Sequence, residues 1–136
     1  MIKNRHFYSR FGSPGRWLGA AVLLVLGVSS QAEPRTTQDG VYSKVQAKQG
    51  GKIYKQQCLV CHDKKYFRPV LKRWSGQSAA ILYDVMSGSM PESNPGGLLP
   101  EQYVDLMAYI FSQSRYPAGE TALDSGALAE ITIQEP

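Results

Sequence analysis

The stretch KIYKQQCLVCHDKKYF, residues 52–67, contains both cysteines of the chain and one of its two histidines. Cys58, Cys61 and His62 lie within five consecutive positions, whereas the other histidine, His6, lies near the N-terminus. Thiols and an imidazole at this spacing point to a disulfide, a redox dithiol, a metal site or the covalent attachment of a cofactor. The compartment and the surrounding residues decide between these readings.

The N-terminal residues have the pattern of an export signal. Four basic residues precede an apolar run of eleven, LGAAVLLVLGV at positions 18–28, and the small residues SSQA follow it. Such a run is short for a membrane span, which needs about 20 apolar residues. We therefore expect residues 1–32 to be a signal peptide, cleaved after Ala32, and the mature chain to work in the periplasm. An uncleaved signal would instead tether the chain to the membrane.

The predicted signal peptide supplies the whole net positive charge of the chain. Four of the 15 basic residues and none of the 11 acidic ones lie in residues 1–32, so residues 33–136 carry 11 of each and are neutral. This balance argues against a nucleic-acid partner. Residues 33–136 are enough for one domain with a modest core.

The charges of the mature chain are unevenly distributed along the sequence. Residues 33–73 carry ten basic and three acidic side chains, net +7, whereas residues 74–136 carry one basic and eight acidic side chains, net −7. A molecule with a positive side orients an acidic partner during encounter. An ordinary solvated surface is the simpler alternative.

Three readings of the cysteine motif fit poorly. A disulfide between Cys58 and Cys61 would close a very small loop and stabilise the chain little. A thioredoxin-like dithiol needs a βαβ context, whereas the segment before Cys58 has a helical pattern. A structural zinc site needs four ligands, and the mature chain offers only two cysteines and His62.

The fourth reading, attachment of a c-type haem, fits the motif. Cys-Leu-Val-Cys-His matches the attachment pattern, in which two thiols form thioethers with the two vinyl groups of one haem edge. The next residue then directs its imidazole at the iron. This predicts one covalent haem c on Cys58 and Cys61, with His62 as an iron ligand. Because the mature chain has no second histidine, the sixth ligand must be of another type.

Methionine is the usual partner of histidine in electron-transfer cytochromes. Met107 lies in residues 100–114, whose apolar positions have the spacing of one helical face, so it is most simply a core residue. Met86 ends a second helical stretch, residues 75–86. Met90 lies in the loop-like sequence SGSMPESNPGG. An apolar side chain is unexpected there, and ligation of the iron would explain it. We favour Met90 as the sixth ligand, with Met86 as the alternative.

With these residues the chain resembles class I c-type cytochromes over residues 44–123. The resemblance rests on the four-residue spacing of Gly50, Tyr54 and Cys58, on the haem motif, on Met90-Pro91, and on Leu106 with the following Ala108–Ile110. The segments RWSG, MPESNPGGL and YPAGETAL are similar to small single-haem cytochromes that accompany bacterial periplasmic dehydrogenases, including quinoprotein ones.

The resemblance implies an all-α cytochrome c fold, in which the N- and C-terminal helices cross around a covalently bound haem. It accounts for Gly50, whose bare backbone would let Tyr109 approach, and it implies that Trp74 packs on the haem. Outside this domain, residues 44–123, we expect a flexible leader at 33–43 and a tail at 124–136.

The chain departs from the family pattern in two places. His62 and Met90 are only 28 positions apart, which is short for the class. Family members usually have a proline whose carbonyl accepts a hydrogen bond from the proximal histidine, often in Gly-Pro, and here Arg68 precedes the one candidate, Pro69. The role of Pro69 in orienting His62 is therefore open.

The resulting hypothesis is a single-haem electron carrier between periplasmic redox proteins, with His62 and Met90 on the iron. No nucleophile–base pair remains once His62 is assigned, so we expect no enzymatic activity. The alternatives are a haem subunit of a periplasmic dehydrogenase complex and, if the sixth site is open, a protein that binds small ligands.

Overall fold

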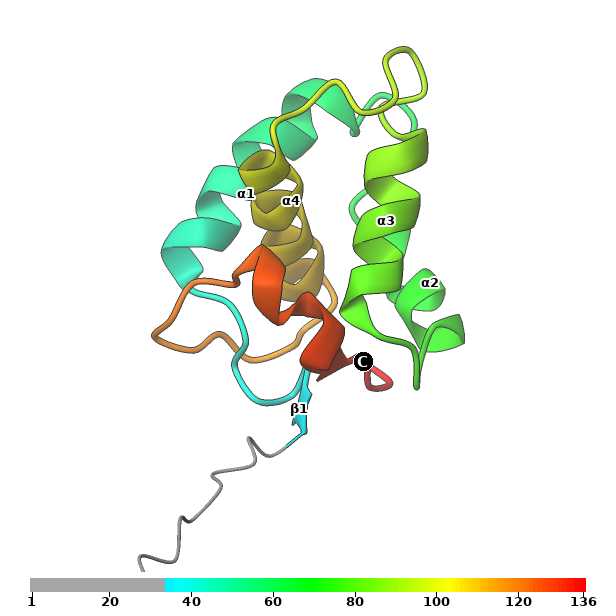
Figure 1. Cartoon of the computed structure of the whole chain (residues 1–136). Helices are drawn as coiled ribbons and strands as arrows, with labels where there is room; N and C mark the ends of the chain where they lie inside the picture. The colour runs from blue at the N-terminus through cyan, green and yellow to red at the C-terminus, as the bar shows by residue number, and fades with distance from the viewer. Residues whose placement is uncertain (1–33) are drawn as a thin grey trace, which may run out of the picture. The chain divides into compact units, whose positions relative to one another are not determined.

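The computed structural model describes residues 34–136, and the predicted signal peptide, residues 1–32, lies outside the described residues. The described elements follow one another in the order β1 (Arg35–Thr36), α1 (Lys44–Gln57), α2 (Phe67–Arg73), α3 (Ala79–Ser89), α4 (Pro100–Gln113), the 3₁₀ helix η1 (Ser125–Glu130) and β2 (Ile131–Thr132) (Figure 1). This mostly helical arrangement agrees with the predicted all-α class. No helix among these residues is both long and apolar enough to cross a membrane.

Helices α1 and α4 lie side by side and approach closely at two adjacent glycines of α1 (Figure 1). A Cβ atom built on Gly50 would stand 1.8 Å from the main-chain oxygen of Asp105, which is far inside van der Waals contact. A Cβ on Gly51 would meet the ring of Tyr109 at 3.0 Å. The absence of a side chain at Gly50 is therefore what allows the two helix backbones to meet.

Helix α4 supplies much of the core. It contacts α1, α2, α3 and η1, and it is the helix that joins α1 and α2 to the rest of the described helices. The predicted apolar face of residues 100–114 is confirmed, because every member is at most 2% exposed: Tyr103, Leu106, Met107, Ile110 and Phe111. Pro100 at the start of the helix lacks only an N–H group that would have no partner inside the helix.

Helix α3 begins later and ends later than the predicted stretch of residues 75–86. Ser78 stops the helix from starting earlier, because its backbone is extended and its hydroxyl accepts a hydrogen bond from the Ala80 N–H at 3.1 Å. At the other end the helix continues through Ser89. Met90 is the first residue beyond it, with extended backbone at φ −127° and ψ 150°.

The segments on either side of the predicted domain differ from the expected flexible leader (33–43) and tail (124–136). Strands β1 and β2 pair in parallel, with Arg35 opposite Ile131. Both segments also bury apolar side chains in the core: Val41 and Tyr42 from the first, Leu128, Ile131 and Ile133 from the second. Long-range packing orders residues that local composition marks as loops.

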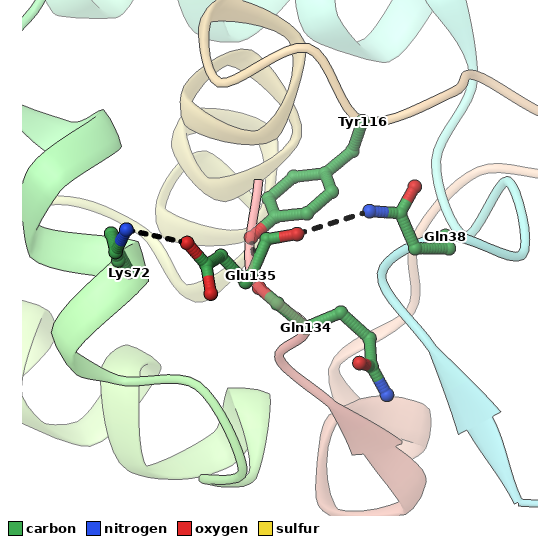
Figure 2. A network of polar contacts seen from close by, with 5 residues as sticks. All are labelled: Gln38, Lys72, Tyr116, Gln134 and Glu135. Atoms are coloured by element: carbon green, nitrogen blue, oxygen red, sulfur yellow. Dashed lines mark hydrogen bonds and ion pairs between the residues drawn. The ribbon is translucent and has the colours of Figure 1, made fainter.

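Residues 134–135 join three parts of the chain (Figure 2). The side chain of Glu135 pairs with Lys72 of α2 at 2.6 Å, and its main-chain oxygen accepts a hydrogen bond from Gln38 at 3.3 Å. The main-chain oxygen of Gln134 accepts a hydrogen bond from the hydroxyl of Tyr116, which follows α4. These contacts connect residues 124–136 to residues 33–43, to α2 and to Tyr116, which follows α4.

Replacement of Gly50 by alanine should destabilise the fold by about 3 kcal/mol or more, because the new methyl group has no room beside Asp105. Gly88→Ala is the matched control, since a Cβ at this position in α3 meets nothing within 4 Å. It should leave stability unchanged or raise it by up to about 1 kcal/mol. Urea unfolding followed by circular dichroism measures both, and equal effects of the two substitutions would contradict the backbone contact.

Candidate functional site

One cavity brings together all five residues that the sequence singles out. It has a volume of about 370 Å³, and its walls come from the end of α1, the segment that follows, α2, α3, the start of the next loop and α4. The predicted residues on its walls are Cys58, Cys61, His62, Trp74 and Met90. The volume lies within the range of about 300–1,000 Å³ that is typical of ligand and cofactor sites.

The deeper wall of the cavity is apolar. Leu82 and Met86 line it from α3, and Leu106 and Ile110 line it from α4, and all four are buried. Polar groups are few and include the exposed side chains of Arg73 and Glu92, among others. An apolar wall with few polar groups suits a large, mostly apolar ligand and excludes water from its surface.

The end of α1 sets the geometry of the cysteine motif. Cys58 is the C-cap residue of α1, and its carbonyl oxygen accepts hydrogen bonds from Cys61 N–H at 3.1 Å and His62 N–H at 2.8 Å. The chain therefore turns tightly around Cys58 and directs all three side chains to one cavity. Both cysteines are free thiols; Cys58 is partly buried and Cys61 is exposed. Burial raises the pKa of the Cys58 thiol, which keeps it protonated.

The imidazole of His62 lies among aromatic rings. Its ring centre is 4.2 Å from that of Tyr66 and 5.8 Å from that of Phe67. Among the hydrogen bonds of residues 34–136, none joins the His62 ring to the carbonyl of Pro69, which lies in the first turn of α2. The orienting role that the resemblance suggests for Pro69 stays a prediction, and the aromatic rings are the groups that surround His62 here.

The main chain at His62 is held by a buried tyrosine of α1. The hydroxyl of Tyr54 lies 2.8 Å from the His62 carbonyl oxygen and 2.9 Å from that of Asp63, so it donates to this pair of acceptors. Burial raises the pKa of Tyr54, with a smaller contribution from the neighbouring Cys58, so the hydroxyl keeps its proton. The sequence marked Tyr54 only through its spacing from Cys58; its hydroxyl role had no local signal.

The three mature methionines occupy different environments. Met90 lines the cavity and is 36% exposed, whereas Met86 lines the same cavity and is 8% exposed. Met107 is fully buried and does not line the cavity, as expected for a core residue. The structure therefore leaves Met90 and Met86 as the two thioethers that face this space, four positions apart on α3 and its C-cap.

Trp74 and Tyr103 also line the cavity. Trp74 is the C-cap residue of α2 and packs partly buried against the core. Tyr103 of α4 is buried, and its hydroxyl donates a hydrogen bond to the main-chain oxygen of Met90 at 2.7 Å. The sequence predicted Tyr103 as a core residue but gave no sign of this bond.

The described residues offer no ordinary metal cluster. Across positions 34–136, no group of three or more His, Cys, Asp and Glu side chains is arranged to hold a metal ion. A structural zinc site, which needs four such ligands, has no support from this arrangement.

Comparison of the chain with protein families, with curated proteins and with solved structures found no match.

Without attached cofactor, iodoacetamide should alkylate Cys61 severalfold faster than Cys58 at pH 8. The raised pKa of Cys58 lowers its thiolate fraction, and burial limits access to it. Mass spectrometry of the Cys58→Ser and Cys61→Ser variants reports each rate separately. In concentrated urea the two rates should converge, and faster reaction of Cys58 under folding conditions would contradict the arrangement of the motif.

Proposed function

We propose that the chain is a single-haem c-type cytochrome that carries electrons between periplasmic redox proteins. The observation that carries this proposal is the convergence of two thiols, one imidazole and one exposed thioether on a single apolar cavity: Cys58, Cys61, His62 and Met90. These are the groups that covalent attachment and iron ligation require, and they come from segments that lie 28 positions apart.

The cavity fits a haem in its donor set and its lining. Free thiols at positions 58 and 61 could each add across a vinyl group, so that one S–H bond and the π bond of the vinyl group are replaced by one S–C and one C–H bond, and no oxidant is needed. The nitrogen of His62 and the sulfur of Met90 would hold the iron, and histidine with methionine is a ligand pair typical of electron-transfer cytochromes. The haem iron would supply a one-electron redox couple.

The chain's own residues would fix the potential and limit rearrangement. A methionine thioether opposite histidine raises the reduction potential. The buried side chains of Leu82, Leu106 and Ile110 line the deeper face of the cavity and exclude water from it. Exclusion of water lowers the local dielectric constant and so also changes the reduction potential. Tyr54 holds the main chain at His62, which would limit movement of this segment when the iron changes its redox state.

The close crossing of α1 and α4 supports the cytochrome c fold as part of this proposal. Gly50 meets the backbone of Asp105 at the crossing, and Gly51 meets the ring of Tyr109. The resemblance predicts that Tyr109 packs against Gly50. In the structure the Tyr109 ring lies against Gly51, the next residue of α1. The short spacing between His62 and Met90 is accommodated because α3 runs as far as Ser89 and places Met90 immediately at its end.

A second function is favoured by the exposure of Met90. Met90 is 36% exposed and follows the last residue of α3, so a small ligand could displace its sulfur from the iron. The chain would then bind ligands such as CO or NO. Absorption spectra recorded with and without CO separate this function from electron transfer.

The uneven charge of the chain supports a redox partner with an acidic surface, such as a periplasmic dehydrogenase. Arg73 at the cavity and Lys64 and Lys65 beside His62 are exposed, whereas Lys72 is already paired with Glu135. The rate of electron transfer with such a partner should fall as ionic strength rises from 0.01 to 0.2 M, because salt screens exposed charges. A rate that salt leaves unchanged would contradict steering, and copurification with a large partner would favour a subunit of a complex.

Expression of the chain with haem-attachment machinery tests the proposal directly. The wild type should gain the mass of one haem and show a sharp α-band when reduced, whereas Cys58→Ser and Cys61→Ser should each lose stable attachment. Ser89→Ala, at the exposed edge of the cavity, is the control that should still attach haem. Absence of bound haem in the wild type, with working machinery, would overturn the proposal and favour a dithiol function for Cys58 and Cys61.

The same spectra identify the sixth ligand. The oxidised wild type should show the weak far-red band of methionine bound to iron, and Met90→Ala should lose it, bind CO readily and have a lower potential. Met86→Ala should keep the band. The reverse result would make Met86 the ligand, and a wild type without the band that binds CO would favour the ligand-binding function.

A further inference from the structure

The main chain of Met90 is held from two helices. Its N–H donates to the carbonyl oxygen of Met86 at 2.9 Å, which continues the hydrogen bonding of α3. Its carbonyl oxygen accepts a hydrogen bond at 2.7 Å from the hydroxyl of Tyr103, which is 2% exposed in α4. Met90 thus lies at a junction where α3 ends and α4 reaches across to it.

The bond from Tyr103 stands out because the loop that follows Met90 is tied mainly to itself. The hydrogen bonds of residues 91–97 are local ones, from Asn94 N–H to Pro91 at 2.8 Å and from Gly97 N–H to Asn94 at 3.0 Å. Among the hydrogen bonds of the described residues, the one from Tyr103 to Met90 is the one that joins residues 90–98 to α4. Apart from its attachment to α3, the Met90 main chain therefore has this one hydrogen bond to the core helix α4.

We propose that Tyr103 is a positioning residue for Met90: its hydroxyl fixes the Met90 main chain so that the thioether stays at the sixth position and keeps small ligands out. This inference rests on the proposed function. Tyr103 would act through the backbone of Met90, because its hydroxyl is bonded to the Met90 main-chain oxygen. When the hydroxyl is removed, the Met90 carbonyl can turn to water, because this residue is partly exposed, and the loop is freed without loss of the core.

The test compares Tyr103→Phe with Tyr83→Phe in the haem-loaded protein. Tyr83 is the matched control because its ring lies 6.1 Å from that of Tyr103, and its hydroxyl makes no hydrogen bond among residues 34–136. In Tyr103→Phe, CO should bind the reduced protein roughly two- to tenfold faster, the factor that corresponds to one intramolecular hydrogen bond. Tyr83→Phe should match the wild type.

A second readout separates positioning from general stability. Urea should abolish the far-red band of Tyr103→Phe at a lower concentration than in the wild type, while the loss of helical circular dichroism shifts less. Equal shifts of both signals would assign Tyr103 a structural role only and overturn the proposal.

A double-mutant cycle with Met90→Ala tests whether Tyr103 acts through Met90. In the Met90→Ala background, Tyr103→Phe should leave the rate of CO binding unchanged. A further acceleration there would show that the hydroxyl acts elsewhere and would overturn the proposal. If the wild type carries haem and shows the far-red band, and Tyr103→Phe behaves like the wild type, only this inference is contradicted. If the wild type binds no haem, the proposed function is contradicted.

Discussion

The direct contact between the backbones of α1 and α4 sets the distance on which the rest of the site depends. Gly50 has no side chain where the main-chain oxygen of Asp105 comes closest, so the two helices meet at a separation that any larger residue would prevent. From this crossing α1 leads to Cys58 at its C-terminal end, and α4 presents Leu106 and Ile110 to the cavity. Because interiors are close-packed, a shift at the crossing would be felt at the cavity walls.

Two buried hydroxyl groups extend this rigid helix pair to the cavity edges. Tyr54 of α1 donates to the main chain at His62, and Tyr103 of α4 donates to the main chain at Met90. Each tyrosine contributes an apolar ring to the core and one polar atom to a loop. The two segments that contain His62 and Met90 are therefore each hydrogen-bonded to one helix of the same pair.

The parts of the structure that sequence could predict are those with a local cause. The apolar face of residues 100–114 could be predicted because its spacing alone carries the information. Cys58, Cys61 and His62 line one cavity because they lie within five positions, and their role stays a prediction. The hydroxyl bond of Tyr103 could not be predicted, because an apolar face predicts burial and says nothing about a partner in another segment. The strand pair was missed for the same reason, since two residues at Arg35–Thr36 have no periodicity and gain their order only from β2.

The pairing of the two flanking segments makes completion of the fold a late event. Gln38 and Glu135, which bond to each other, are 97 positions apart in the chain. Closing so long a loop carries an entropic penalty, and contacts between distant positions slow folding. During synthesis from the N-terminus, β1 has no strand partner until β2 has been made. Helix α2, which Lys72 joins to Glu135, gains this tie only in the same final step.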